Sequence, residues 1–169
     1  MRYLFLFLLL TFIACCSNEL QQSNEPVTDT LMRVPTGQDV YPAFKGADSV
    51  QVLYYKNPFG ADSLRYYRFF TYLATTDTTA LATIQEALAA PVKGWVQQHC
   101  RSEGKMYLLR GEEVIKTIYF NLQPGTCNHL YFIIDGNFYY LPVSDRLTRL
   151  LQALRLQAKE PPSELAELE

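Results

Sequence analysis

The stretch 130–141 constrains the fold more than any other part of the chain, because it predicts a two-stranded hairpin centred on Asp135-Gly136. Asp-Gly favours a type I′ turn, in which both central residues have positive φ. Such a turn sets the pairing of the strands, outward from Ile134 opposite Asn137. Side-chain alternation then sorts the hairpin onto two faces. One face carries Leu130, Phe132, Ile134, Tyr139 and Leu141, and the other carries Tyr131, Ile133, Phe138 and Tyr140.

Two further hairpins are expected earlier in the chain. A β-branched and aromatic run from Val50 to Lys56 precedes an Asn-Pro-Phe-Gly turn, and Leu64 to Ala74 is expected to return as the second strand. Lys105 to Leu109 and Val114 to Leu122 form the next pair, across a turn that contains Gly111. The sequence therefore predicts about six strands in three hairpins.

Two helices are expected to pack on this sheet. One begins after an N-cap at Asp77 and ends before Pro91, and the other begins after Ser144 and ends before Pro161. Apolar residues recur at helical spacing along the second helix, and they predict the face that covers the core side of the last hairpin. Strand pairs interspersed with helices predict an α+β fold with an antiparallel sheet.

The N-terminal residues differ from the rest of the chain. Arg2 precedes an unbroken apolar run from Tyr3 to Ala14. A helix that crosses a membrane needs about twenty such residues, so this shorter run is typical of a secretory signal peptide that is removed.

The run ends in Phe12-Ile13-Ala14-Cys15, which resembles the lipobox of bacterial lipoproteins, with Phe where Leu is usual. The resemblance covers only about the first sixteen residues, and it implies that Cys15 becomes the lipidated N-terminus, with Cys16 as the alternative. Two or three acyl chains anchor a protein durably, because each buried methylene contributes about 0.8 kcal/mol. The resemblance implies a lipid-anchored protein of the cell envelope. Because no Asp directly follows either cysteine, the outer membrane is favoured over the inner one, and the facing side stays open.

The chain of 169 residues has room for one domain. We expect a signal peptide at 1–14, a lipidated N-terminus and flexible tether at 15–47, and a single α+β domain at 48–159. An acidic tail that contains prolines follows at 160–169. The tether is expected to be flexible because it is rich in Gln, Asn, Pro and Thr and has no sustained apolar period, although its part around Val40–Phe44 could lie along the domain as an irregular edge.

Cys100 and Cys127 predict a disulfide, since an oxidising envelope favours the bond. Closing a loop of about 28 residues would stabilise the domain by about 3.5 kcal/mol in the chain-entropy treatment. His99 and His129 lie beside these cysteines, which leaves a metal site or a Cys-His nucleophile as alternatives. Adjacent ligands rarely converge on one ion, so the disulfide is preferred and no metal is expected.

Other chemistry is not indicated by the sequence. Glu112 and Glu113 are neighbours in an extended turn, where their carboxylates point apart. No phosphate-binding loop, nucleophile elbow or zinc-protease helix is present, so no catalytic residue and no cofactor are predicted. Arg146, Arg149 and Arg155 are expected on the solvated face of the last helix, with an anionic partner as the alternative. A formal net charge of -2 argues against nucleic-acid binding.

The second face of the last hairpin is the remaining candidate for function. Tyr131, Ile133, Phe138 and Tyr140 are too apolar to be left simply in water, so either another part of the chain covers them or they bind a protein or glycan partner. The sequence thus favours a membrane-anchored envelope lipoprotein with a non-catalytic binding domain. The alternatives are a small envelope hydrolase with a dispersed site and an inhibitor or immunity-type lipoprotein.

Overall fold

In the part of the chain that the structure describes, the sheet has six strands, all paired antiparallel, in the order β2-β1-β3-β4-β5-β6. A computed structural model describes residues 33–60, 69–93 and 100–161. The strands are β1 (Ser49–Tyr55), β2 (Phe70–Thr75), β3 (Gly104–Arg110), β4 (Glu113–Asn121), β5 (His129–Ile134) and β6 (Asn137–Pro142). The helices are α2 (Gly37–Val40), α4 (Thr78–Leu88) and α5 (Asp145–Arg155), and a 3-10 helix, η1, spans Pro42–Gly46. The α+β fold predicted from the sequence is confirmed.

The last hairpin follows its local turn chemistry. Asp135 and Gly136 have φ values of 49° and 78°, as a type I′ turn requires. Ile134 pairs with Asn137, and the register continues to Leu130 with Leu141. The predicted pairing is therefore confirmed.

The two long helices begin where the sequence predicts. Asp77 accepts a hydrogen bond from the Ala80 N–H at the start of α4, and Ser144 accepts one from the Leu147 N–H at the start of α5. The predicted end of α5 is wrong, because the helix stops at Arg155. After the helix the chain turns back to the sheet, where Lys159 exchanges main-chain hydrogen bonds with Tyr72, and this pairing explains why the helix ends before Pro161.

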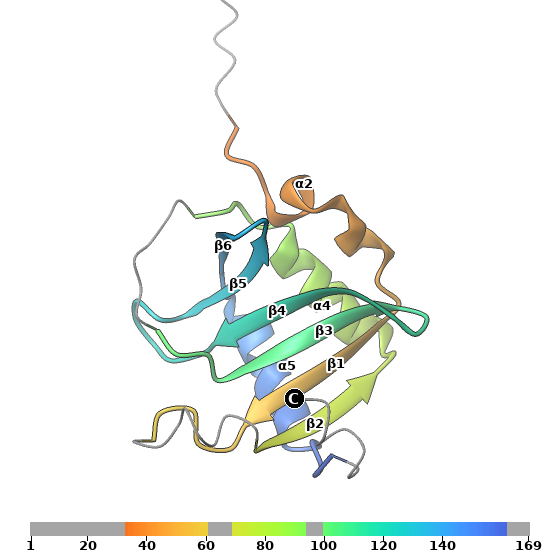
Figure 1. The fold of residues 1–169 in the computed structure, drawn as a ribbon, viewed down its shortest axis with the longest axis vertical. Coiled ribbons are helices and arrows are strands. Elements are labelled where there is room, and N and C mark those ends of the chain that lie inside the picture. The colour runs from red at the N-terminus through yellow and green to blue at the C-terminus, as the bar shows by residue number, and fades with distance from the viewer. Residues whose placement is uncertain (1–32, 61–68, 94–99, 162–169) are drawn as a thin grey trace, which may run out of the picture. The chain divides into compact units, whose positions relative to one another are not determined.

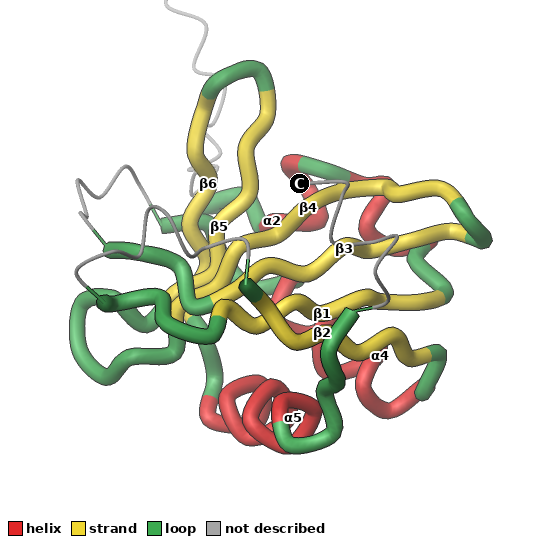
Figure 2. The backbone as a smooth tube through the Cα atoms, turned by 60° about the horizontal axis from the view of Figure 1, so that its bottom comes forward, coloured by secondary structure: helices red, strands yellow, loops and turns green. Residues whose placement is uncertain are grey.

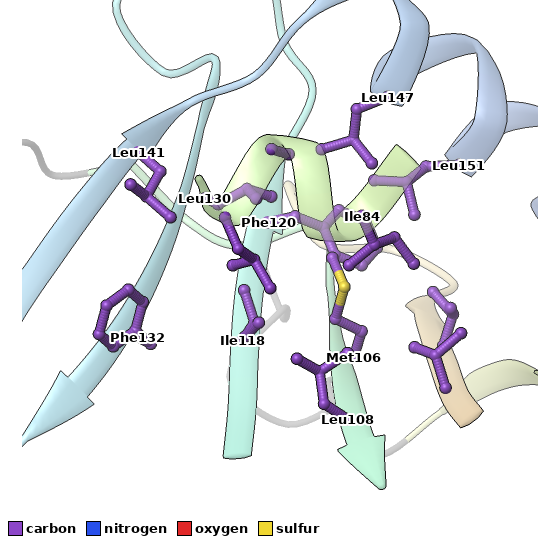
Figure 3. Packing of buried hydrophobic residues seen from close by; sticks show 14 of the residues in the cluster. Ile84, Met106, Leu108, Ile118, Phe120, Leu130, Phe132, Leu141, Leu147 and Leu151 are labelled. Atoms are coloured by element: carbon purple, nitrogen blue, oxygen red, sulfur yellow. The ribbon is translucent and has the colours of Figure 1, made fainter. Parts of the chain in front are cut away.

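The helices α4 and α5 cover one face of the sheet (Figures 1 and 2). Figure 3 shows their apolar side chains meeting those of the strands in a single cluster. At about 25 cal/mol per Å² of buried apolar surface, this layer is the main source of stability. Its fully buried members include Ile84, Met106, Leu108, Ile118, Phe120, Leu130, Phe132, Leu141, Leu147 and Leu151.

The second strand of the first hairpin is described from Phe70 onward. β2 begins at Phe70, which pairs with Tyr55, and the sequence predicted a strand from Leu64 to Ala74. Leu64 lies outside the described residues. The Lys56 N–H donates a 2.9 Å hydrogen bond to the Phe69 carbonyl, so the contact between the two chain segments extends one residue beyond the pairing of Tyr55 with Phe70.

The compact unit begins at Val34, earlier than the predicted domain start at Asp48. In the part expected to be tether, Thr36 caps α2 in a capping box with Asp39. Phe44 of η1 is 0% exposed, and its ring lies 5.0 Å from that of Phe132, edge to face. Residues 36–46 therefore contribute to the core.

The β4–β5 ladder is much shorter than the other ladders. Only Tyr119–Asn121 of β4 pair with β5, while the rest of the strand, Glu113–Ile118, pairs with β3 alone. The β5–β6 hairpin projects away from the sheet beside this part of β4 (Figure 2). We call the divergence of β4 from β5 the split.

The N-terminal segment lies at the split on the helix side. The Tyr41 hydroxyl donates a hydrogen bond of 3.0 Å to the Ile115 carbonyl in β4. The Lys116 ammonium lies 5.0 Å from the centre of the Tyr41 ring, and the Tyr41 ring lies 5.0 Å from that of Phe44. Tyr41 and Phe44 thus connect β4 with the Phe132 side of the last hairpin.

Candidate functional site

An aromatic cluster lies on the face of the sheet that is turned away from α4 and α5, which we call the outer face. Leu130 and Leu141 belong to the core, so the residues beside them in β5 and β6 point to the outer face. We call the cluster the aromatic patch. Its members are Tyr119, His129, Tyr131, Phe138 and Tyr140.

Ring contacts join the members of the patch across three strands. Tyr119 of β4 stacks on Tyr131 of β5, with ring centroids 4.8 Å apart. The Tyr131 ring lies 5.7 Å from that of Tyr140 and 5.9 Å from that of Phe138. Pairs at these separations contribute about 0.5–1.5 kcal/mol beyond their buried area. The patch is therefore a preorganised surface of rings.

The sheet register extends the patch into a row of side chains. Each strand contributes one outer-face residue to this row, and each of these residues is paired with the one in the neighbouring strand. The row runs Tyr72, Leu53, Lys105, Tyr119, Tyr131 and Tyr140. Tyrosine presents an apolar ring with a hydroxyl at its tip, which suits a surface that binds partly in water.

Tyr131 is the central residue of the patch. Its hydroxyl lies 3.0 Å from that of Ser102, within hydrogen-bond distance. Burial raises the pKa of Tyr131, against the opposing effect of the Ser102 hydrogen bond, so the phenol stays neutral at physiological pH. The patch thus offers the neutral Tyr131 hydroxyl and the faces of its rings.

His129 forms the buried end of the patch. Its ring lies 5.2 Å from that of Tyr140, edge to face, and the residue is 4% exposed. Burial lowers the pKa of His129 and the Lys93 charge acts in the same direction, whereas the nearby Thr126 main chain opposes them. The buried Nδ1 atom has no hydrogen-bond partner among the described residues. His129 is therefore a neutral ring at the base of the patch.

A disulfide joins Cys100 to Cys127, with α-carbons 5.5 Å apart, which confirms the predicted bond. It fixes the entry to β5 next to His129. Both sulfurs are in the bond, so neither is a thiolate that could attack a substrate or bind a metal. His99, the other histidine in the alternatives, lies outside the described residues.

The described parts of the chain contain no group of three or more His, Cys, Asp or Glu side chains that could hold a metal ion. Glu113 pairs with Arg110 in the β3–β4 ladder, and Gly111 has a φ of 59° in the turn between them. Glu112 and Glu113 are both exposed.

A pocket of about 520 Å³ lies elsewhere on the sheet, where β1, β2 and the β3–β4 turn meet. Its lining comprises Ser49, Val50, Gln51, Ala74, Thr75, Thr76, Leu109, Gly111 and Glu112. Glu112 is the ionisable residue of that lining.

The arginines of α5 have different surroundings. Arg146 forms a 2.8 Å ion pair with Glu86 of α4. Arg155 lies 3.7 Å from Glu103, and its guanidinium stands over the Tyr54 ring at 5.8 Å. Arg149 is exposed. Two of the three thus connect α5 to neighbouring elements.

The predicted binding face lies within this outer-face surface. Phe138 is 44% exposed, and Tyr131, Ile133 and Tyr140 are half-buried. Sequence reasoning did not find Tyr119, whose place depends on the register between β4 and β5. Alternation along β4 predicts that Tyr119 lies on the other face of the sheet from its core neighbours Ile118 and Phe120. It does not predict that Tyr119 lies beside Tyr131.

Cys15 and Cys16, the residues predicted to carry lipid, lie outside the described residues. In the part of the chain that is described, no helix is long and apolar enough to span a membrane. Comparison with models of known families, with curated proteins and with solved structures finds no match.

Proposed function

We propose that this protein is a lipid-anchored envelope lipoprotein whose α+β domain binds a partner through the aromatic patch, without catalysing a reaction. The anchor is inferred from the lipobox-like residues that end at Cys15. The binding function is inferred from the patch.

One observation carries the proposal. Both long helices cover one face of the sheet (Figure 1). The opposite face presents a connected group of aromatic rings, of which Phe138 is 44% exposed. Aromatic rings that are packed against one another lose little conformational freedom on binding, and Tyr is among the residues enriched where binding energy concentrates.

Photocrosslinking in living cells tests the binding. A photoreactive phenylalanine analogue at Phe138 is expected to give a discrete adduct, because this ring is exposed beside the patch. The matched control carries the same analogue at Leu156, which is 90% exposed and follows α5. Equal adducts at both positions, or none at Phe138, would contradict a binding surface on the outer face.

Metabolic labelling with a palmitate analogue tests the anchor. Cys15→Ser is expected to abolish the label and leave unprocessed precursor, with Cys16→Ser as the control that keeps the label. Continued labelling of the Cys15→Ser variant would mean that Cys16 carries the lipid or that the lipobox interpretation is wrong.

A further inference from the structure

The split leaves part of the β4 hydrogen-bond ladder without a neighbouring strand. The N–H of Tyr55 donates to the Glu103 carbonyl, so the alternate residues Lys105 and Tyr107 of β3 also point their main chain toward β1. Their partners in β4, Tyr119 and Thr117, must then point their main chain away from β3.

Tyr119 pairs with β5, but Thr117 does not. The pairing of β4 with β5 stops at Tyr119 and Tyr131, and no backbone partner for Thr117 exists on that side among residues 33–60, 69–93 and 100–161. The neighbouring Ile115 carbonyl is taken by the Tyr41 hydroxyl. Within the described residues, the Thr117 N–H and C=O therefore have no main-chain partner.

Strand β5, which faces β4 across the split, also has main-chain groups without a described partner. The Tyr140 carbonyl accepts from the Lys93 N–H outside the sheet, so Tyr131, opposite Tyr140, directs its main chain toward β4. Ile133 has the same orientation as Tyr131, yet β4 has already diverged at its level. Unpaired main-chain groups thus border the split in both strands.

The two outer edges of the sheet are protected in a way that the split is not. Tyr72 of β2 exchanges two main-chain hydrogen bonds with Lys159, at 2.7 and 2.9 Å. Tyr140 of β6 accepts one from Lys93 at 2.8 Å. Such covering prevents unwanted strand pairing. At the β4 edge, the described residues supply one hydrogen bond to the main chain from the side facing β5 beyond Tyr119, and it comes from the Tyr41 hydroxyl.

Apolar side chains accompany these unpaired groups. Val114 of β4 is 49% exposed and Phe138 of β6 is 44% exposed, and both are among the large exposed hydrophobic residues of the described chain. Ile133 lies beside Phe138 in the β5–β6 pairing. Both strands that border the split therefore carry apolar side chains, Val114 in β4 and Ile133 in β5, and Phe138 lies beside Ile133 in the hairpin.

We infer that the partner of this domain is an extended peptide segment of another protein, which adds as a strand to β4 at Thr117 and places apolar side chains against Phe138 and Ile133. The N–H and C=O of Thr117 match the main chain of an extended peptide, and neighbouring side chains then give selectivity. A glycan has no such main chain. The β5–β6 hairpin projects beside this edge, which favours a narrow segment over the sheet of a second copy (Figure 2). This inference rests on the proposed function and specifies its partner.

The test uses random linear peptides displayed on phage, selected against the full mature protein in detergent micelles, with each selected peptide then synthesised. Thr117→Pro removes the N–H that the inference requires, and proline is tolerated where that N–H faces away from the neighbouring strand. We expect this variant to raise the Kd of selected peptides by about tenfold or more. The matched control Thr117→Val keeps the N–H and should change the Kd by less than about twofold.

Hydrogen exchange provides a reading that needs no variant. Bound peptide should slow exchange of the Thr117 amide in the wild-type protein, and unchanged exchange would overturn the inference even if Thr117→Pro failed to fold. Peptides that bind Thr117→Pro normally but lose affinity for Phe138→Ser would overturn strand addition and leave the proposed function intact. Peptides insensitive to both changes would overturn both proposals. Failure to select any peptide, or a dimer that Thr117→Pro dissociates, would overturn the peptide partner.

Discussion

Phe44→Ala should destabilise the domain strongly, although the sequence predicts only that the segment of this residue is tether or an irregular edge of the domain. Phe44 is 0% exposed, and its ring lies 5.0 Å from those of both Tyr41 and Phe132. Truncating a fully buried Phe removes its transfer free energy and leaves a cavity, at a cost of about 3–5 kcal/mol. That loss is a large share of the roughly 5–15 kcal/mol that stabilises a typical domain.

Urea unfolding followed by circular dichroism measures the change in free energy of unfolding. The matched control is Phe59→Ala, because Phe59 is 44% exposed, and its loss should stay below about 1 kcal/mol. Equal, small losses for both variants would refute the reasoning that residues 36–46 belong to the core.

Three further outcomes are expected. Reducing the bond between Cys100 and Cys127 should lower the free energy of unfolding by about 3.5 kcal/mol, given a sequence separation of 27, and mass mapping that found both thiols alkylated without reduction would contradict the bond. Tyr54→Phe removes the 2.8 Å hydrogen bond to the Leu151 carbonyl while keeping the ring, so urea unfolding should show a loss of about 0.5–1.5 kcal/mol, and no loss would mean that this buried bond does not stabilise α5. His129 has a lowered pKa in the folded state, so the unfolded state binds its proton first and stability should fall as pH drops below about 6.5; His129→Asn should reduce this slope, and an unchanged slope would contradict its burial as the cause.

The sequence predicted those parts of the fold that depend on local chemistry. The Asp135-Gly136 turn set the register of the last hairpin, because a two-residue turn leaves little choice of pairing. The N-caps at Asp77 and Ser144 marked helix starts, since each side chain satisfies an otherwise unpaired N–H.

The missed features depend on contacts between residues far apart in the chain. Phe44 sits in a polar stretch without periodicity, and its burial follows from meeting Phe132. The β4–β5 split also lacks a local signal, because it arises where the β5–β6 hairpin leaves the sheet. A register shift between Leu108 and Leu109 in the β3–β4 pairing is likewise not apparent in the alternation.

The candidate site divides in the same way. Alternation along one hairpin placed Tyr131, Phe138 and Tyr140 on a common face. Tyr119 joins them only through pairing between strands from different hairpins, and its ring then stacks on Tyr131 at 4.8 Å.

Hydrogen exchange of the protein in its own membranes tests the central claim most directly. Mass spectrometry would compare exchange before and after detergent purification, with the α5 amides as the internal reference. A bound partner on the outer face predicts slower exchange in the membranes at Thr117, Ile133 and Phe138, with no change in α5. Identical exchange at these three residues in both states would contradict the claim that the domain binds a partner there.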